Sequence, residues 1–366
     1  MTTYHGEIQC ETIYKSGKNV GKRCENRAYW DCIKEKGRYR CGMHSRNITK
    51  TELLKDPKAK EKRSIEIYNM LKEAESIQKQ NFDQKKKGKL IVRKMYIMKK
   101  IDYVKGYYPV FPNIKHQNRK DGFGMSSLSP MVLGPVLSYF PYNEVKIIKI
   151  PNIENYYQGA KQYICDINYS NMDNIHLNDH GYNKLLKMYE DIEPHRHKYT
   201  KKELDIICKD IDIKKPKIYK PVFSVYYNKY GIGTAYTYIE SRYFYCYWYK
   251  KLATKTDEYL DLIQKLENGY NLCIYGYDGR PVRYSYEKFS DENFVDGRPV
   301  IYKGNDFLDI ENQDLLKKIM YDIYLDISKP FGHELVLYSL LTIEHENDYP
   351  WNIYYSKNKD LYKNIF

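Results

Sequence analysis

The sequence predicts an α+β protein, in which a small cysteine-rich module and a basic helix precede a mostly helical globular body with a small sheet. Three observations support this. Cysteine and histidine cluster in the first 45 residues, the basic excess is confined to the first third, and the remainder combines helical and strand-like apolar patterns. We therefore divide the chain into a module at 1–48, a basic helix and connector at 49–120, and a globular domain at 121–366.

The distribution of charge predicts an anionic partner for one end of the chain. The 366 residues carry a net charge of +14. Residues 1–120 hold 30 basic against 13 acidic side chains, whereas residues 121–366 hold 31 against 34. Such asymmetry indicates nucleic acid, bound through residues 1–105, although a merely solvated basic surface is the alternative.

Composition excludes several classes of protein. A hydrophobic share of 42% excludes a wholly disordered chain, and the 42 tyrosines, with abundant Lys, Asn and Ile, fit the coding bias of an A/T-rich genome. No window reaches the roughly 18 apolar residues of a membrane span. The first ten residues lack the basic and apolar parts of a secretion signal. We therefore expect an intracellular protein that does not enter a membrane.

The first 45 residues predict a structural zinc site. Cys10, Cys24, Cys41 and His44 are the expected ligands, because Zn²⁺ takes four thiolate or imidazole ligands and the C-x2-H pair supplies two from one turn. Cys32 is left as a spare ligand or a buried strand residue. A segment this polar has no core of its own, so bound metal would stabilise it. Reduced, unpaired thiols are the alternative interpretation.

A charged helix and connector follow the module. Leucine, isoleucine and alanine recur between charges over 50–85, which predicts a helix. Residues 84–105 then carry nine basic side chains against a single Asp102. This connector is suited to lie along a phosphate backbone, and a solvated linker is the alternative.

One stretch of the body brings functional groups to one helical face. A proline followed by Asn152 is a helix-start signal, with the asparagine as N-cap. On a period of 3.6 residues, Glu154, Gln158 and Lys161 form one stripe. A Gly/Pro-rich loop at 122–135 and a predicted strand at 145–150 precede this helix. A solvated helix face is the alternative interpretation.

The same eight residues, E-N-Y-Y-Q-G-A-K from Glu154 to Lys161, resemble the signature of NADAR proteins, which are N-glycosidases acting on N-ribosyl bonds. The resemblance covers about 120 of the final 246 residues. It implies a NADAR-like body with a long helical stretch at 240–266 ended by Gly269, a strand from 271 leading into a turn, and a closing helix at 330–341. The chain departs from the family in an insertion at about 164–239, in a tryptophan motif that follows the closing helix, and in its loop sequence.

The resemblance also implies site residues. Glu154 would be the catalytic carboxylate, with Gln158 and Lys161 binding substrate. Asp278, at a strand end, is the expected second acid; Glu334 is the alternative, and Asp278 is otherwise a turn residue. His333 and Glu334 are adjacent at a helix start and should point apart.

Two further residues are candidate substrate contacts. Arg242, beside Glu240, would clamp a phosphate or form a structural ion pair. Trp351, in an Asp…Trp element at 348–352, would stack on a base or fill the core. Both alternatives remain open from the sequence.

The expected function is hydrolysis of an N-ribosidic bond in an ADP-ribosyl or nucleotide-derived substrate. Among such substrates, ADP-ribose linked to nucleic-acid bases is favoured by the basic N-terminal region with its predicted zinc module. The main alternative is a non-catalytic nucleic-acid-binding or virion-associated protein. The composition and module pairing resemble proteins of large DNA viruses, which would place it in host cytoplasm or nucleus. An adaptor that uses its tyrosine-rich surface is a third possibility.

Overall fold

The computed structural model describes two compact units. The smaller unit holds residues 1–87, 95–108 and 269–271, and the larger unit holds 88–94, 109–268 and 272–366. The described residues are 21–22, 24, 30–32, 39–40, 51–53, 57–95, 101, 103–113, 119, 122–142, 144–168, 176–192, 200–210, 220–278, 294–295, 298–299, 313–327 and 329–363. Helices and small sheets alternate through them, which confirms the predicted α+β class. No helix in this part of the chain is long and apolar enough to span a bilayer.

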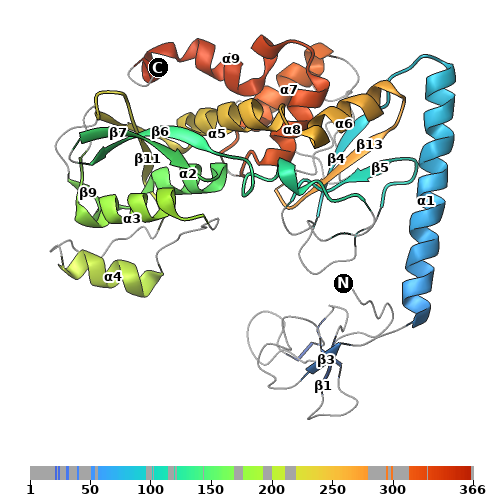
Figure 1. The fold of residues 1–366 in the computed structure, drawn as a ribbon, viewed down its shortest axis with the longest axis horizontal. Helices are drawn as coiled ribbons and strands as arrows, with labels where there is room; N and C mark the ends of the chain where they lie inside the picture. The colour runs from blue at the N-terminus through green and yellow to red at the C-terminus, as the bar shows by residue number, and fades with distance from the viewer. Residues whose placement is uncertain are drawn as a thin grey trace. The chain divides into compact units, whose positions relative to one another are not determined.

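The smaller unit contains a short antiparallel sheet and one long helix (Figure 1). The sheet has the order β2-β1-β3, with β1 at Trp30–Cys32, β2 at Tyr39–Arg40 and β3 at Thr51–Leu53. Helix α1 spans Pro57–Asp83, so the helix predicted at 50–85 is confirmed except at its start, where Thr51–Leu53 forms β3 instead. Near its end, Asn81 donates a hydrogen bond to the Gly269 carbonyl at 2.8 Å.

Only one of the four predicted zinc ligands has a described side chain. Cys24 is buried, with no exposed surface. Cys10, Cys41 and His44 lie outside the described residues, and only the backbone of Cys32, in β1, is described. The zinc site therefore stays a prediction.

A three-stranded sheet with the order β4-β13-β5 forms one part of the larger unit. Strands β4 (Leu90–Lys94) and β13 (Leu272–Gly276) run parallel, and β5 (Tyr108–Val110) lies on the other side of β13. Every residue of β13 is buried, as expected for a central strand covered on both faces. Strand β4 falls within the predicted charged connector, and its Leu90, Ile91 and Val92 are buried.

The other strands of the larger unit frame a short helix. Strands β6 (Val136–Tyr142) and β7 (Glu144–Ile150) form a hairpin, which confirms the predicted strand at 145–150. It leads into α2 (Ile153–Ala160), and β8 (Lys161–Gln162) then pairs with β11 (Phe223–Tyr227), which also pairs with β12 (Gly233–Tyr236). Figure 1 shows α2 and α3 (Asp179–Glu190) beside this hairpin.

Lys184 on α3 fixes the chain that follows α2. Its ammonium donates to the Lys161 carbonyl at 2.8 Å, to Gln162 Oε1 at 2.9 Å and to Asp166 Oδ2 at 2.5 Å. Lys184 and Asp166 are both buried, and burial lowers the pKa of Lys184 while Asp166 opposes that shift. All three donors of the ammonium are used, so this buried pair is a structural cross-link.

Helix α5 (Tyr238–Ala253) is the central helix of the larger unit. It contacts α2, the β11–β12 hairpin, α8 (His333–Thr342) and α9 (Pro350–Lys357). Because neighbours surround it, polar as well as apolar side chains of α5 are buried. The helical stretch predicted at 240–266 is two helices, since Thr256 caps a new helix, α6 (Asp257–Glu267). Gly269, at φ +88°, follows as predicted.

The segment 164–239, predicted as an insertion, contributes β11 and β12 to the packing around α2 and α5. It also contains α3 and α4. The remaining described elements are η2 (Ser126–Leu128), η3 (Ile164–Asp166), β9 (Ile167–Asn168), β10 (His176–Leu177), α4 (Lys201–Asp210), β14 (Phe294–Val295), β15 (Arg298–Pro299), α7 (Gln313–Leu325), η6 (Glu346–Asp348) and α10 (Lys359–Tyr362).

Candidate active site

The start of α2 is fixed by its cap and by the Gly/Pro-rich loop before it. Asn152 Oδ1 accepts a hydrogen bond from the Asn155 amide at 2.8 Å, so the predicted N-cap is confirmed. The amides of Ile153 and Glu154 donate to carbonyls of the loop, those of Leu133 and Pro130, at 2.9 and 3.0 Å. These bonds fix the position of the Glu154 backbone.

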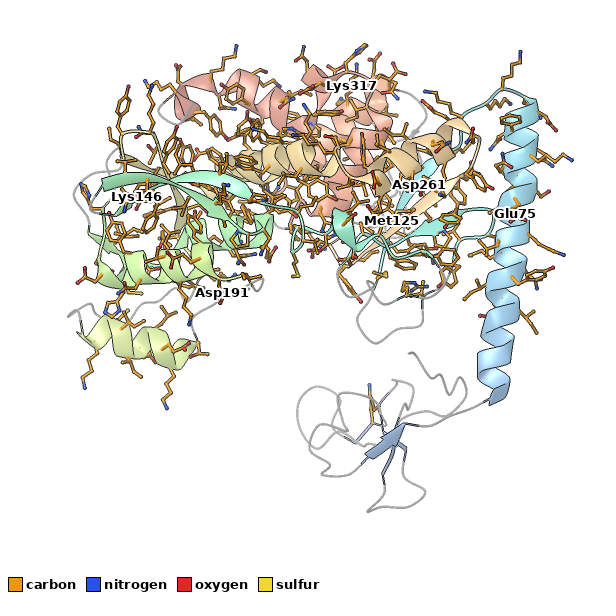
Figure 2. All side chains as sticks on the ribbon, viewed as in Figure 1. Glu75, Met125, Lys146, Asp191, Asp261 and Lys317 are labelled. Atoms are coloured by element: carbon orange, nitrogen blue, oxygen red, sulfur yellow. The ribbon has the colours of Figure 1, made fainter. Side chains whose placement is uncertain are left out.

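Two neighbouring contacts hold the same region in place. A Cβ at Gly134 would lie 1.8 Å from the Pro151 carbonyl oxygen, so only glycine lets the loop pass the helix start this closely. The side chain of Asn155 donates to the carbonyl of Asp191 at 2.9 Å. Two residues that help to locate this region are labelled in Figure 2: Asp191, which accepts this hydrogen bond, and Met125, which precedes η2 in the Gly/Pro-rich loop.

Glu154, Gln158 and Lys161 form the stripe that the sequence predicts. Gln158 Nε2 donates to Glu154 Oε1 at 3.1 Å, and Lys161 Nζ donates to Gln158 Oε1 at 2.9 Å. The Lys161 ammonium also lies 4.3 Å from the ring centre of Tyr157. The Glu154 residue is only 9% exposed, so the stripe lies at the edge of the core and is not the solvated face of the alternative interpretation.

A second carboxylate lies at the start of α8. Glu334 has no exposed surface, and neither of its oxygens has a hydrogen-bond partner. A Cβ placed on Gly276, at the end of β13, would lie 2.0 Å from Glu334 Cγ and 2.1 Å from its Oε1. The glutamate therefore occupies the space that a side chain at position 276 would need.

Tyr245 on α5 connects the two carboxylates electrostatically. Burial holds the pKa of Tyr245 well above its ordinary value, and the charges of Glu154, Tyr249 and Glu334 raise it further. Glu154 and Glu334 therefore both contribute to the raised pKa of one buried tyrosine. Because Tyr245 keeps its proton, that hydroxyl is a hydrogen-bond donor in this site.

The other polar groups near Glu334 are engaged elsewhere. Tyr249 donates its hydroxyl proton to the Leu128 carbonyl at 2.7 Å. His333 Nε2 lies 3.0 Å from the Pro112 carbonyl, and its Nδ1 lies 3.4 Å from Glu334 Oε2. The sequence led us to expect that His333 and Glu334 point apart. That expectation is wrong, because both side chains are buried and their polar ends approach each other.

The two candidates for the second acid flank the same glycine. A Cβ on Gly332 would lie 2.7 Å from the Cβ of Asp278 and 2.8 Å from Glu334 Oε2. Asp278 is exposed, whereas Glu334 is fully buried. Glu334 is thus the member of the pair that shares Tyr245 with Glu154.

The structure places Arg242 and Trp351 in the core. Terminal nitrogens of Arg242 donate to the backbone carbonyls of Tyr324, Asp326 and Lys329, the last two at 3.1 and 2.5 Å. Arg242 is 2% exposed, and these bonds go to backbone carbonyls, so its guanidinium is a structural cross-link and not a phosphate clamp. Trp351 is 1% exposed and stacks on Tyr349, with ring centres 4.8 Å apart, as the core alternative expects.

Sequence reasoning did not single out Tyr245 or Gly276. Tyr245 belongs to a run of aromatic residues that any buried helix of this chain might carry, so its type alone is uninformative. Gly276 did give a signal, because a glycine inside an apolar strand often marks a close approach by another group. Among the described residues, no group of three His, Cys, Asp or Glu side chains is arranged to hold a metal ion.

Comparison with models of known protein families, with characterised proteins and with solved structures finds no match to this chain.

Proposed function

We propose that the larger unit hydrolyses an N-glycosidic bond, with Glu154 as its catalytic carboxylate. The observation that carries this proposal is the pair of buried carboxylates, Glu154 and Glu334, whose charges both raise the pKa of Tyr245. Cleavage of a glycosidic bond passes through a cation-like sugar and uses two acidic groups in different roles. The resemblance of the α2 sequence to NADAR proteins supports the N-ribosidic version, in an ADP-ribosyl or nucleotide-derived substrate.

The contacts assign a role to each residue of the α2 stripe. Glu154 stabilises the positive charge that develops at the anomeric carbon, or directs water to it. Gln158 holds one Glu154 oxygen, and Lys161 holds Gln158, so the carboxylate is oriented for its task. Water supplies the hydroxyl of the released sugar, and its proton goes to the leaving nitrogen. Tyr245 stays protonated, because burial and both carboxylates raise its pKa, so its hydroxyl is a candidate proton donor in this step.

We further propose that the substrate is linked to nucleic acid. The net charge of residues 1–120 supports this, as do the exposed side chains of Lys85, Lys86 and Lys87 after α1. The proposed zinc ion, held by Cys10, Cys24, Cys41 and His44, would order the module that precedes α1 and these lysines. It plays no part in the cleavage step.

The test is release of ADP-ribose from ADP-ribosylated single-stranded DNA, followed by mass spectrometry. The wild type should release it, and Glu154→Gln should release at least about 100-fold less, the size of a typical acid–base or electrostatic contribution. Glu190→Gln, an exposed glutamate at the end of α3, is the matched control and should behave as the wild type. Equal release by the wild type and Glu154→Gln would contradict the assignment.

A second function, nucleic-acid binding without catalysis, is favoured by the same exposed lysines. It predicts that replacing Lys85, Lys86 and Lys87 by glutamine weakens DNA binding and reduces its salt dependence by up to three charges, while Glu154→Gln has no effect. No release of ADP-ribose, together with this binding behaviour, would favour the binding protein over the enzyme.

A further inference from the structure

The outward face of the β6–β7 hairpin is apolar. An antiparallel sheet that packs on one side normally turns polar side chains to water on the other, because side chains alternate between the two faces. The inward Phe140 is buried against aromatic rings of α3. On the outward face, however, Leu137 is 49% exposed, Val145 42% and Ile147 64%. Tyr139 lies directly across from Ile147 and is half-buried. Such a face favours a covering surface, because burial of apolar area is favourable.

The turn between β11 and β12 extends this apolar face. Gly231, at φ +75°, lies against the hairpin, since a Cβ there would be 2.7 Å from Val145 Cγ2 and 3.3 Å from Pro141 Cβ. The residues on either side of this glycine are also apolar and exposed, Tyr230 at 70% and Ile232 at 38%. Hairpin and turn therefore form one surface. We call it the hairpin surface, and it consists of Leu137, Tyr139, Val145, Ile147, Lys149, Lys229, Tyr230 and Ile232.

The charges at the hairpin surface are positive. Lys149 lies directly across from Leu137, and the Lys229 ammonium stands 5.1 Å from the ring centre of Tyr230. Both lysines are exposed, as is Lys146 on the same strand as Lys149 (labelled in Figure 2). Within the part of the chain that the structure describes, none of the three lysines has an ion-pair partner, and neither the hairpin nor the turn has an acidic side chain.

This local positive charge contrasts with the rest of the larger unit. Residues 121–366, which make up most of that unit, hold 31 basic against 34 acidic side chains. Two other lysines of the unit, Lys250 and Lys317, pair with acids of the same unit. Lys250 pairs with Glu346, and Lys317 pairs with Asp348 at 2.7 Å. Unpaired lysines beside an apolar surface are complementary to a partner that is both acidic and apolar.

We infer that the hairpin surface binds a segment of a partner protein that carries acidic and aliphatic side chains. Its carboxylates pair with Lys149 and Lys229, and its aliphatic side chains cover the exposed apolar residues between them. The rows of side chains on a sheet have the spacing of an extended polypeptide, which therefore matches this surface. The inference goes beyond the proposed hydrolysis and does not depend on it, because the surface contains none of the residues assigned to cleavage.

Two other occupants match the surface less well. Nucleic acid is acidic, but all of the strongly exposed apolar residues except Tyr230 are aliphatic, and aliphatic side chains offer no ring on which a base can stack. A second copy of the chain would bring the same lysines together in a symmetric contact, which is unfavourable.

The test is selection from a phage-displayed library of random peptides of about 12 residues, long enough to cross the two strands. The full-length wild type is the bait, and Ile147→Ser is used for counter-selection. The enriched peptides should combine a net negative charge with aliphatic residues. In fluorescence anisotropy, synthetic copies should bind Ile147→Ser and Lys149→Glu at least about 10-fold more weakly than the wild type.

Matched controls exclude general effects of the substitutions. Leu260→Ser removes an aliphatic side chain that is 54% exposed on α6, and Lys187→Glu reverses an exposed charge on α3. Both should bind the peptides as the wild type does. Ile147→Ser and Lys149→Glu alter exposed side chains, so their thermal melts should stay close to that of the wild type.

The inference would be overturned by a selection that yields no peptide dependent on Ile147, or by selected peptides without an acidic excess. Self-association of the wild type in sedimentation, lost in Ile147→Ser, would also overturn it, because the surface would then be a contact between copies. Binding to vesicles rich in anionic lipid that is lost in Ile147→Ser would assign the surface to a lipid headgroup layer instead.

Discussion

The close approach of Glu334 to Gly276 allows a direct test by Gly276→Ala. The added methyl group would lie 2.0 to 2.2 Å from three atoms of Glu334, against an ordinary contact of about 3.5 to 4 Å. Gly276 does not have positive φ in this structure, so the alanine itself adds no backbone strain and alone should stabilise the chain by about 0.4–1 kcal/mol. Overpacking costs about 1–3 kcal/mol and should outweigh that gain.

Removing the Glu334 side chain should reverse the effect of Gly276→Ala on stability. In Glu334→Ala the three colliding atoms are gone, so Gly276→Ala should become neutral or stabilising by up to about 1 kcal/mol. The coupling between the two positions should therefore be about 1–3 kcal/mol, measured by urea unfolding of the four proteins of a double-mutant cycle. A matched cycle with the exposed Glu344→Ala should be additive. Additivity at Gly276 and Glu334 as well would refute the reasoning, because it would mean that the two residues do not share this space.

Three further predictions concern other parts of the chain. Burial raises the pKa of Asp322 to about 6, so folding disfavours the charged carboxylate. Asp322→Asn should therefore stabilise the protein by about 1 kcal/mol at pH 8, a figure reduced because the side chain is only half-buried. In thermal melts, this stabilisation should fade as the pH drops from 6 towards 4. Lys184→Met leaves the buried Asp166 carboxylate without its ion-pair partner and should lower the free energy of unfolding in urea by about 3–5 kcal/mol. The exposed Lys187→Met on the same helix should lower it by under about 1 kcal/mol. Similar losses in the two variants would contradict the cross-link. Purified protein should contain about one zinc ion per chain by mass spectrometry, lost in Cys24→Ser and retained in Cys208→Ser, and a metal-free wild type would refute the site.

Local physical chemistry made one part of the site predictable. Asn152 caps α2 because a short acceptor before a helical period satisfies a free amide, whatever the surrounding fold. The alignment of Glu154 with Gln158 follows from helical periodicity, and the hydrogen bond between them confirms it. Lys161 lies just after the helix, in β8, and donates to Gln158 from there. The strand at 145–150 and the end of α6 near Gly269 were predictable for the same reason.

The fate of Arg242 was not predictable from its neighbours in sequence. A charged residue in a helix usually faces solvent, and the sequence offered a phosphate or Glu240 as its partner. Helix α5 is instead enclosed by α2, α8, α9 and the β11–β12 hairpin. The guanidinium of Arg242 is therefore buried and donates hydrogen bonds to backbone carbonyls that follow α7. Only the packing of elements distant in sequence decides which faces of a helix are buried.

By itself, the sequence determined the α+β class, the helix that carries Glu154 and the alignment of Glu154 with Gln158, because these depend on periods and caps within a few residues. It gave Asp278 as the expected second acid and Glu334 as the alternative. The tertiary structure gave the two residues different surroundings: Asp278 is exposed, whereas Glu334 is buried where β13 ends in Gly276 beside the first turn of α8, almost 60 positions further along the chain. Burial and the loss of partners arise only when such distant segments pack together, so no local pattern reveals them.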